Sequence, residues 1–135
     1  MGRATVTREA RGTMEIKRIH PYVESGDLEA ARDFYVGMFG LKVAMEEPVV
    51  GLVSPHVPSA QLIITPRGTG MPRVDFGIDV GDGAAVDAAH ERASAMGMRI
   101  VYPLCNEPWG VRRFFVEDPD GNVVNVLAHL APEAP

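Results

Sequence analysis

The sequence predicts an α+β domain in which two tandem βαβββ modules form a curved mixed sheet around a cavity, with the helices on the outer face. Strand-like and helix-like stretches follow one another in the same order twice along the chain. The joint between helix and next strand is G-L-K-V at 40–43 and G-M-R-I at 97–100, which indicates an internal duplication. Because one helix covers only one face of a sheet, the other face of each module remains to build a cavity.

The first module begins with alternating apolar residues over positions 16–23, which is typical of a strand. Asp27 then stands where a helix N-cap belongs, because its carboxylate accepts hydrogen bonds from the first free backbone amides. Apolar residues recur at intervals of three and four up to Gly40, a residue that suits the turn ending a helix. Short strands follow near residues 41–47, 49–54 and 60–65.

The second module repeats this order. Residues 73–80 alternate between apolar and polar, which predicts a strand with one apolar face. Asp82 and Gly83 lead into a helix about two residues longer than the first, and Gly97 ends it. The remaining strands are expected at 98–101, 111–117 and 122–127, with the turn D-P-D-G-N between the last two.

These elements predict one domain at residues 14–130, made of modules 14–66 and 72–130. Residues 1–13 show no hydrophobic period and are rich in Arg, Thr and Gly, which predicts a disordered leader. Residues 131–135 are expected to form a frayed tail. Met14 is an alternative to Met1 as the true start of the protein.

The composition excludes several classes of function. The 135 residues include 13 basic and 18 acidic side chains, for a net charge of −5, which disfavours a nucleic-acid partner. No apolar run approaches the ~18 residues that span a membrane, so no membrane partner is expected. The single cysteine, Cys105, rules out an internal disulfide and a cysteine-cluster metal site. This cysteine usage fits a reducing cytoplasm, which is the predicted location.

Three stretches of the sequence resemble a known family. The first spans residues 20–41 and contains D-L-x-x-A-x-x-F-Y, with F-G-L at its end. The second spans residues 73–97, and the third, 108–126, contains D-P-D-G-N. In order and spacing they resemble the vicinal oxygen chelate superfamily, which groups glyoxalases, bleomycin-resistance proteins and extradiol dioxygenases. The resemblance implies the glyoxalase/bleomycin-resistance fold but leaves the reaction open, because this fold hosts both enzymes and pure binders.

The resemblance also implies where a metal ion would lie in metal-dependent members, on inward-facing His and Glu residues of several strands. His20, seven residues before the capping Asp27, matches the first ligand position. Arg73 and Asn125 stand at the second and third positions, where Arg has no acceptor atom and Asn offers only a neutral carbonyl. We therefore predict no metal ion and no cofactor.

An unusual metal site remains an alternative, if one inward-facing carboxylate joins His20. The candidates for that carboxylate are Asp75, Glu24 and Glu46. No catalytic residue is predicted, because the chain has no G-x-S-x-G elbow and no glycine-rich phosphate loop. The simplest interpretation of Cys105 is a small buried hydrophobe.

Strand alternation predicts an amphipathic ligand cavity instead. The candidate ligand-binding residues are His20, Tyr22, Glu24, Arg73, Asp75, Tyr102, Trp109, Arg113, Phe115 and Asn125. Aromatic planes with a few placed polar groups suit a flat organic ligand. Two alternatives remain open: Trp109 could simply pack its hairpin, and the two arginines could form ion pairs with Asp75 and Glu24 rather than clamp an anion.

The sequence therefore favours a metal-independent protein that sequesters an aromatic or polycyclic natural product, as in antibiotic resistance. The resemblance to the bleomycin-resistance branch implies a homodimer with pockets between the subunits. One alternative is a metal-dependent lyase, epimerase or extradiol dioxygenase. Another is a metal-free isomerase or cyclase with Asp75 or Glu24 as base. A subunit that regulates or stabilises a partner is a further hypothesis, without a sequence feature of its own.

Overall fold

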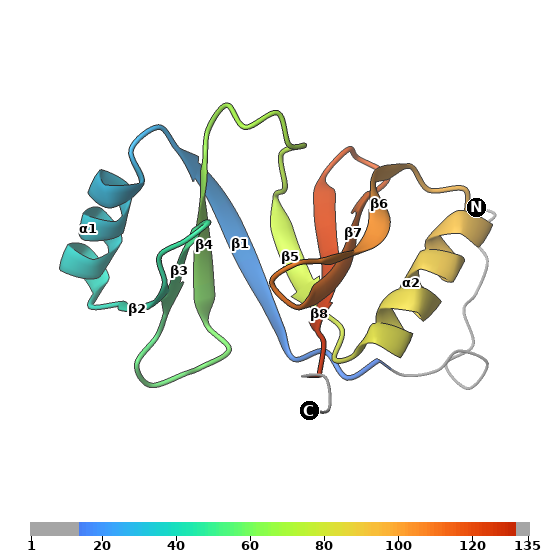
Figure 1. Cartoon of the computed structure of the whole chain (residues 1–135), viewed down its shortest axis with the longest axis horizontal. Helices are drawn as coiled ribbons and strands as arrows, with labels where there is room; N and C mark the ends of the chain where they lie inside the picture. Colours follow the sequence, from blue (N-terminus) through green and yellow to red (C-terminus); the bar gives the residue numbers. More distant parts are fainter. Residues whose placement is uncertain (1–13, 132–135) are drawn as a thin grey trace.

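The computed structural model describes residues 14–131 and contains one eight-stranded sheet and two helices (Figure 1). The strands are β1 (Arg18–Ser25), β2 (Lys42–Met45), β3 (Val50–Val53), β4 (Gln61–Pro66), β5 (Phe76–Asp79), β6 (Ile100–Glu107), β7 (Val111–Glu117) and β8 (Val123–His129). The helices are α1 (Leu28–Phe39) and α2 (Gly83–Ala95). The expected leader 1–13, and all of the expected tail except Ala131, lie outside the described residues.

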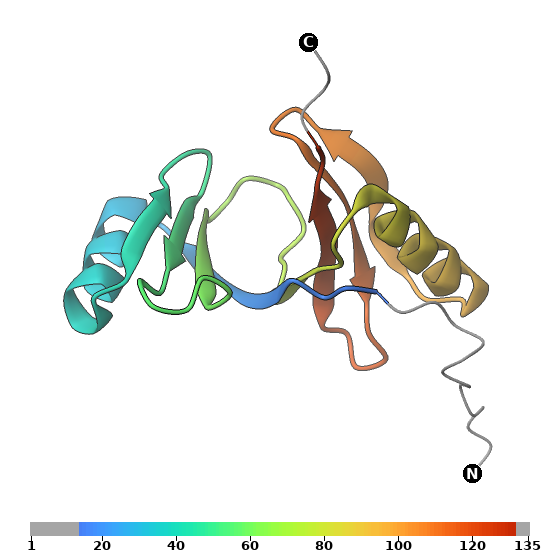
Figure 2. The ribbon, with the colours of Figure 1, turned by 90° about the horizontal axis from the view of Figure 1, so that it is seen from below.

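The sheet has the strand order β2-β3-β4-β1-β5-β8-β7-β6, so each half of the chain supplies four adjacent strands. The two halves join where β1 pairs with β5 antiparallel, whereas β1–β4 and β5–β8 are parallel pairs. Figure 2 shows the sheet curved like a U, with α1 and α2 outside and the concave face between them. The predicted α+β fold with helices on the outer face is confirmed.

The helix ends follow the residues that the sequence predicts. Asp27 caps α1, where its carboxylate accepts a hydrogen bond from the Ala30 amide at 3.0 Å. Asp82 caps α2 in the same way, through the Ala85 amide at 2.8 Å. Gly40 ends α1 with φ of 69°, a left-handed conformation that glycine adopts without strain. These caps fix the direction in which each helix leaves the sheet.

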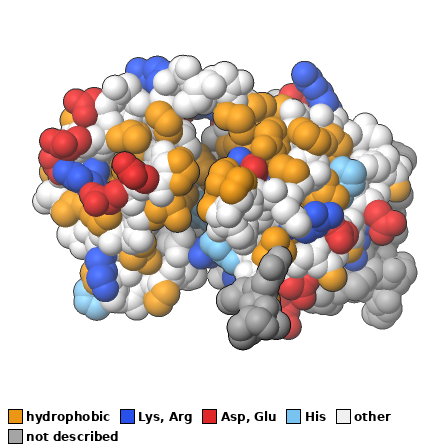
Figure 3. All heavy atoms as spheres, viewed as in Figure 1, with side chains coloured by type: hydrophobic (Ala, Val, Ile, Leu, Met, Phe, Trp, Pro, Cys, Tyr) orange, Lys and Arg blue, Asp and Glu red, His pale blue; other side chains and the backbone are white. Residues whose placement is uncertain are grey.

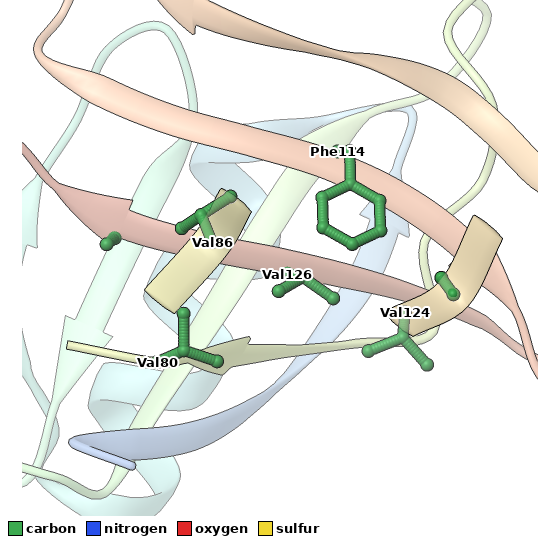
Figure 4. Packing of buried hydrophobic residues seen from close by; sticks show 7 residues of the cluster. Val80, Val86, Phe114, Val124 and Val126 are labelled. Carbon is green, nitrogen blue, oxygen red and sulfur yellow. The ribbon is translucent and has the colours of Figure 1, made fainter. Parts of the chain in front are cut away.

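The larger hydrophobic core lies between α2 and the outer face of the second half of the sheet. Val86 of α2 and Phe114 of β7 are fully buried in it. Figure 4 shows them packed with Val80, Val124 and Val126. Phe114 alternates along β7 with residues that face the groove described below, so this one strand divides the core from the site.

The core of the first half is smaller. It consists of Val50, Leu52 and Ile64, with partly buried side chains of α1 packed against it. No residue of α1 is fully buried, and its Phe34 and Met38 stay more than half exposed. The second half therefore contributes more buried apolar surface than the first.

Two strands differ from the expectation. β5 begins at Phe76 rather than 73, and β6 extends to Glu107 rather than ending at 101. The pairing of β6 with β7 shifts register twice, between Ile100 and Tyr102 and again before Cys105. Such irregularities break the alternation of period two, so the sequence pattern ends before the strand does. Neither α1 nor α2, the helices of residues 14–131, has the length and apolar character of a membrane-spanning helix.

Candidate functional site

The concave face of the sheet holds a groove between the two halves of the chain. It consists of two adjoining cavities, of about 290 and 350 Å³. The residues that line both cavities are Tyr22, Pro48, Val49, Thr65, Trp109 and Arg113. The cavities therefore form one continuous groove. Figure 3 shows this face hollowed between the halves, with hydrophobic side chains on both sides of the hollow.

The loop that joins β4 to β5 closes one end of the groove. Thr69, Met71 and Arg73 of this loop line the first cavity. In Figure 1 the loop lies at the top of the molecule, between the two halves. The second cavity continues toward the other end, past His20 and Asn125. Both halves of the chain contribute to each cavity.

Three aromatic side chains gather on the wall that β6 and β7 form, and we call them the aromatic cluster: Tyr102, Trp109 and Phe115. The rings of Tyr102 and Phe115 stack with centroids 4.6 Å apart. The guanidinium carbon of Arg113 lies 5.2, 5.3 and 4.9 Å from the ring centroids of Tyr102, Trp109 and Phe115 respectively. A cation at this distance is attracted by the ring faces, so the cluster holds Arg113 in place.

Glu107 neutralises Arg113 and links it to the cluster. Its Oε2 accepts hydrogen bonds from Arg113 Nε at 2.7 Å and from the Tyr102 hydroxyl at 2.8 Å, and Arg113 Nη2 lies 2.6 Å away. Both side chains of the ion pair are largely buried, so solvent ions screen their attraction less than in an exposed pair. The hydrogen bond to Glu107, followed by burial, raises the pKa of the Tyr102 phenol, which therefore remains a donor at neutral pH.

The floor of the second cavity is a row of buried polar side chains. The Asn125 amide donates to the Tyr22 hydroxyl at 2.8 Å, and that hydroxyl lies 3.3 Å from His20 Nε2. His20 and Asn125 are each only 2% exposed. Burial and then the charge of Arg18 lower the pKa of His20 to about 4, against an opposing effect of Asp79 and with a smaller lowering by His129. His20 is therefore neutral at pH 7.

The family model described as Glyoxalase/Bleomycin resistance protein/Dioxygenase superfamily matches residues 18–126. The chain belongs to this superfamily. No curated protein matches the sequence. Membership confirms the superfamily that the three sequence stretches resemble, but it does not identify a branch, because the superfamily name itself spans enzymes and binding proteins.

Solved structures share the fold. Methylmalonyl-CoA epimerase from Mycobacterium tuberculosis is similar with a TM-score of 0.70 and 20% identity, over 90% of this chain and 93% of that one. A superfamily member from Vibrio splendidus 12B01 is similar with a TM-score of 0.62 and 19% identity, over 84% of this chain and 99% of that one. A chain described as NAD-dependent benzaldehyde dehydrogenase from Legionella pneumophila is similar with a TM-score of 0.68 and 16% identity, over 82% of this chain and 98% of that one. At these identities the likeness concerns the fold alone.

A metal ion of the kind expected for metal-dependent superfamily members does not fit the residues around His20. The sheet register places Gly77 opposite His20, and Asn125 opposite Gly77 on the next strand. A Cβ atom at position 77 would lie 2.6 Å from His20 Nε2, so the imidazole already fills that space. Glycine has no ligand atom in a side chain, and asparagine has no charge. Residues 14–131 contain no group of three His, Cys, Asp or Glu that could hold a metal.

Arg73, which the sequence matches to the second ligand position, does not lie beside His20 in the structure. Arg73 precedes β5 and belongs to the loop at the end of the groove, where its side chain is mostly exposed. Alternation predicts which face a side chain takes, but the point where a strand starts depends on pairing with its neighbours, which here begins at Phe76. Gly77 is the residue beside His20.

The carboxylates proposed for an unusual metal site are engaged elsewhere or lie apart from His20. Asp75 accepts a hydrogen bond from the Val123 amide at 2.8 Å, and Glu46 forms an ion pair with Arg32 at 2.9 Å. Glu24 lines the first cavity, whereas His20 lines the second. The chemistry of this donor set is that of neutral hydrogen bonding rather than cation binding.

The structure brings most of the predicted site residues to the groove. The first cavity is lined by Tyr22, Glu24, Arg73, Tyr102, Trp109, Arg113 and Phe115, and the second also by His20 and Asn125. Asp75 is the exception, since it does not line either cavity and instead supports the start of β8. Whether these residues bind a ligand stays a prediction.

Glu107 is a residue of the groove that was not predicted from the sequence, and it is the ion-pair partner of Arg113. Arg73 does face Asp75, at 3.7 Å, but Arg113 pairs with Glu107 rather than with Glu24. Glu107 lies in the part of β6 that follows its register shifts, where alternation gives no guide. A usable signal was its place two residues before Trp109, at the hairpin that carries the aromatic cluster.

Proposed function

We propose that this protein binds an aromatic or polycyclic small molecule in the groove without a metal ion, and sequesters it as an antibiotic-resistance protein does. The observation that carries the proposal is the aromatic cluster beside a neutral polar floor. Trp109 is 50% exposed and lines both cavities. A half-exposed indole offers a large flat surface with few rotamers to lose, which suits stacking with a planar ring.

The state of the charged groups favours binding over chemistry. Arg113 and Glu107 neutralise each other, and Asp75 is tied to the backbone of β8. His20 is buried and neutral, without a carboxylate in hydrogen-bond distance among the described residues. A general acid or base needs a free proton site next to the ligand, and these three groups do not offer one.

Glu24 supports a second candidate, a metal-free isomerase. Its carboxylate lines the first cavity and has no ion-pair or hydrogen-bond partner within residues 14–131. A free carboxylate beside a bound ligand has the chemistry to remove a proton from carbon. Hydrogen–deuterium exchange of a bound ligand in D₂O, present in the native protein and absent in Glu24→Gln, would favour this candidate. Binding without exchange in either protein favours sequestration.

Fluorescence of Trp109, the single tryptophan, tests the binding proposal. We expect saturable quenching by at least one of doxorubicin, 9-aminoacridine and quercetin, with a dissociation constant in the micromolar range. Tyr102→Leu should weaken binding several-fold, because it removes the ring stacked on Phe115. Phe34→Leu on the outer helix is the matched control and should bind as the native protein does. A broad panel of such compounds without any quenching would contradict the proposal.

We also propose that the chain forms a homodimer. In its support, α1 exposes a group of large apolar side chains, namely Phe34, Met38 and Phe39. Contiguous apolar surface of this kind is typical of association sites. Sedimentation equilibrium should give about twice the chain mass of 14.6 kDa. A single species of the chain mass at all concentrations would contradict the homodimer.

A further inference from the structure

We propose that Arg113 determines the chemical class of the ligand, by donating a hydrogen bond to an uncharged carbonyl oxygen on a planar ring system. The inference rests on the proposed binding function and adds the ligand class to it. It is carried by three observations: a donor of Arg113 that has no partner, the rigid setting of its guanidinium, and the balance of charge along the groove.

The first observation concerns the free donor. Arg113 directs Nε and Nη2 at Glu107 and also interacts with the Tyr102 hydroxyl, whereas Nη1 forms no hydrogen bond within residues 14–131. The partnerless polar side-chain atoms that are fully buried in the described chain are Arg18 Nε, His20 Nδ1 and Asn125 Oδ1. Nη1 is not among them, so it remains accessible, and Arg113 lines both cavities. The groove therefore presents a donor that needs an acceptor.

The second observation is that Arg113 is already fixed. The aromatic cluster surrounds the guanidinium at 4.9 to 5.3 Å, and Glu107 holds one edge of it. An arginine that is ordered before binding loses little side-chain entropy when a ligand arrives. A ring that lies against Trp109 would bring a ring-bound oxygen to the same wall of the groove, since Trp109 and Arg113 are in contact. The two side chains together suit a ring and its carbonyl.

The third observation is the charge of the groove. The charged residues that line the two cavities are Arg18, Arg73, Arg113, Glu24, Glu47 and Glu107. Positive and negative side chains are equal in number, and His20 is neutral at pH 7. An anionic ligand would bring an unmatched charge into a partly buried site that also contains the free carboxylate of Glu24. A neutral acceptor avoids this cost.

The geometry of the ion pair also disfavours a carboxylate ligand. Carboxylates bind arginine best through two parallel hydrogen bonds to neighbouring nitrogens. Glu107 already occupies the edge formed by Nε and Nη2. The ligand therefore meets chiefly Nη1, and one carbonyl oxygen suffices to accept from it.

A matched set of three-ring compounds tests the inference: 9-fluorenone, fluorene, which lacks the carbonyl, and 9-fluorenone-2-carboxylate, which adds a charge. Equilibrium dialysis gives the dissociation constant of each. We expect the native protein to bind 9-fluorenone about tenfold more tightly than fluorene, the gain of one hydrogen bond to a charged donor. We expect the carboxylate to bind more weakly than 9-fluorenone.

Variants assign the difference to Arg113. The double variant Glu107→Gln/Arg113→Gln removes the charges together and leaves no unpaired buried ion. It should bind 9-fluorenone no better than fluorene, whatever its affinity for fluorene itself. Arg113→Lys is the second variant. It keeps the positive charge for Glu107 but has a single nitrogen in place of the guanidinium, so no second nitrogen remains at the position of Nη1, and the preference should fall. Arg112→Gln is the control, because Arg112 faces the opposite side of β7 and pairs with Asp87 of α2.

The outcomes separate this inference from the proposed function. If fluorene and 9-fluorenone bind the native protein equally, or if the carboxylate binds as tightly as 9-fluorenone, the assignment to a neutral carbonyl is wrong while aromatic binding stands. A preference for 9-fluorenone that survives in both Arg113 variants would overturn the role of Arg113. If none of the three compounds binds, the inference falls together with the proposed aromatic function.

Discussion

His20 shows how one buried residue gives the site its character. Its imidazole lies over Gly77, next to Tyr22 and Asn125, where the superfamily resemblance suggested a metal ligand. The Tyr22 hydroxyl accepts from Asn125, and His20 Nε2 is the acceptor in range of the phenol proton among the described residues. The three side chains thereby form a directed, uncharged hydrogen-bond chain, in which His20 Nδ1 and Asn125 Oδ1 remain without a partner among the described residues.

The lowered pKa of His20 predicts a pH dependence of stability. In the unfolded chain this histidine titrates near 6.5, but in the folded protein only at about 4. Between these values the unfolded state binds a proton that the folded state does not, so stability falls as the pH decreases from about 6.5 to about 4. Urea unfolding of the native protein and His20→Gln should give a constant difference in free energy above pH 7. Below pH 6.5 the native protein should lose stability relative to the variant, and parallel profiles would contradict the burial of a neutral His20.

Gly77→Ala tests whether the imidazole occupies the space beside β5. The added methyl would meet His20 Nε2 at 2.6 Å and Cε1 at 2.9 Å. Overpacking of this kind costs about 1–3 kcal/mol. Gly37→Ala in α1 is the control, because nothing lies within 4 Å of its Cβ, and a helical Ala should gain about 0.5–1 kcal/mol. Guanidinium unfolding measures both, and an unchanged midpoint for Gly77→Ala would show that the ring lies elsewhere.

At the scale of the elements, the two halves use the same topology with unequal cores. α2 buries Val86 and Ala93 in a cluster around Phe114, whereas α1 buries no residue fully. The first half completes its structure through β1, which pairs with strands of both halves. The side of the groove that the first half forms is therefore stabilised mainly by strand pairing and less by packing against α1.

Phe114→Ala should reveal this asymmetry. Phe114 is fully buried against α2, and removing such a ring costs about 3–5 kcal/mol. Phe34→Ala removes the same atoms from a side chain of α1 that is 54% exposed in the single chain, and should cost about 1 kcal/mol or less when unfolding is measured at concentrations where the chain is monomeric. Equal losses in chemical denaturation would contradict the arrangement of the cores.

The order of elements was predictable because it depends on local signals. Capping by Asp27 and Asp82, and the glycine that follows α1, fix helix ends from within a few residues. Alternation placed His20 and Tyr22 on the groove face because strand side chains have a period of two. The start of β5 and the extension of β6 to Glu107 were not predictable in this way, since pairing and register shifts between distant strands decide them. The Arg113–Glu107 pair was missed for that reason.

At the scale of the whole molecule, the pairing of β1 with β5 turns two similar halves into one curved sheet. This pairing brings Tyr22 and Thr65 of the first half opposite Trp109 and Arg113 of the second. The groove is thus a product of the complete chain, and the net charge of −5 says little about it, because its lining is balanced. The net charge therefore describes the surface of the whole protein and not the charge of the groove.

The most direct test of the central claim is a Trp109 fluorescence titration with the aromatic panel, made before and after removal of divalent ions by EDTA and desalting. We expect the same saturable quenching and the same dissociation constant in both preparations, because residues 14–131 contain no group of three His, Cys, Asp or Glu side chains that could hold the ion. Quenching that disappears on chelation and returns when a divalent ion is added back would contradict it.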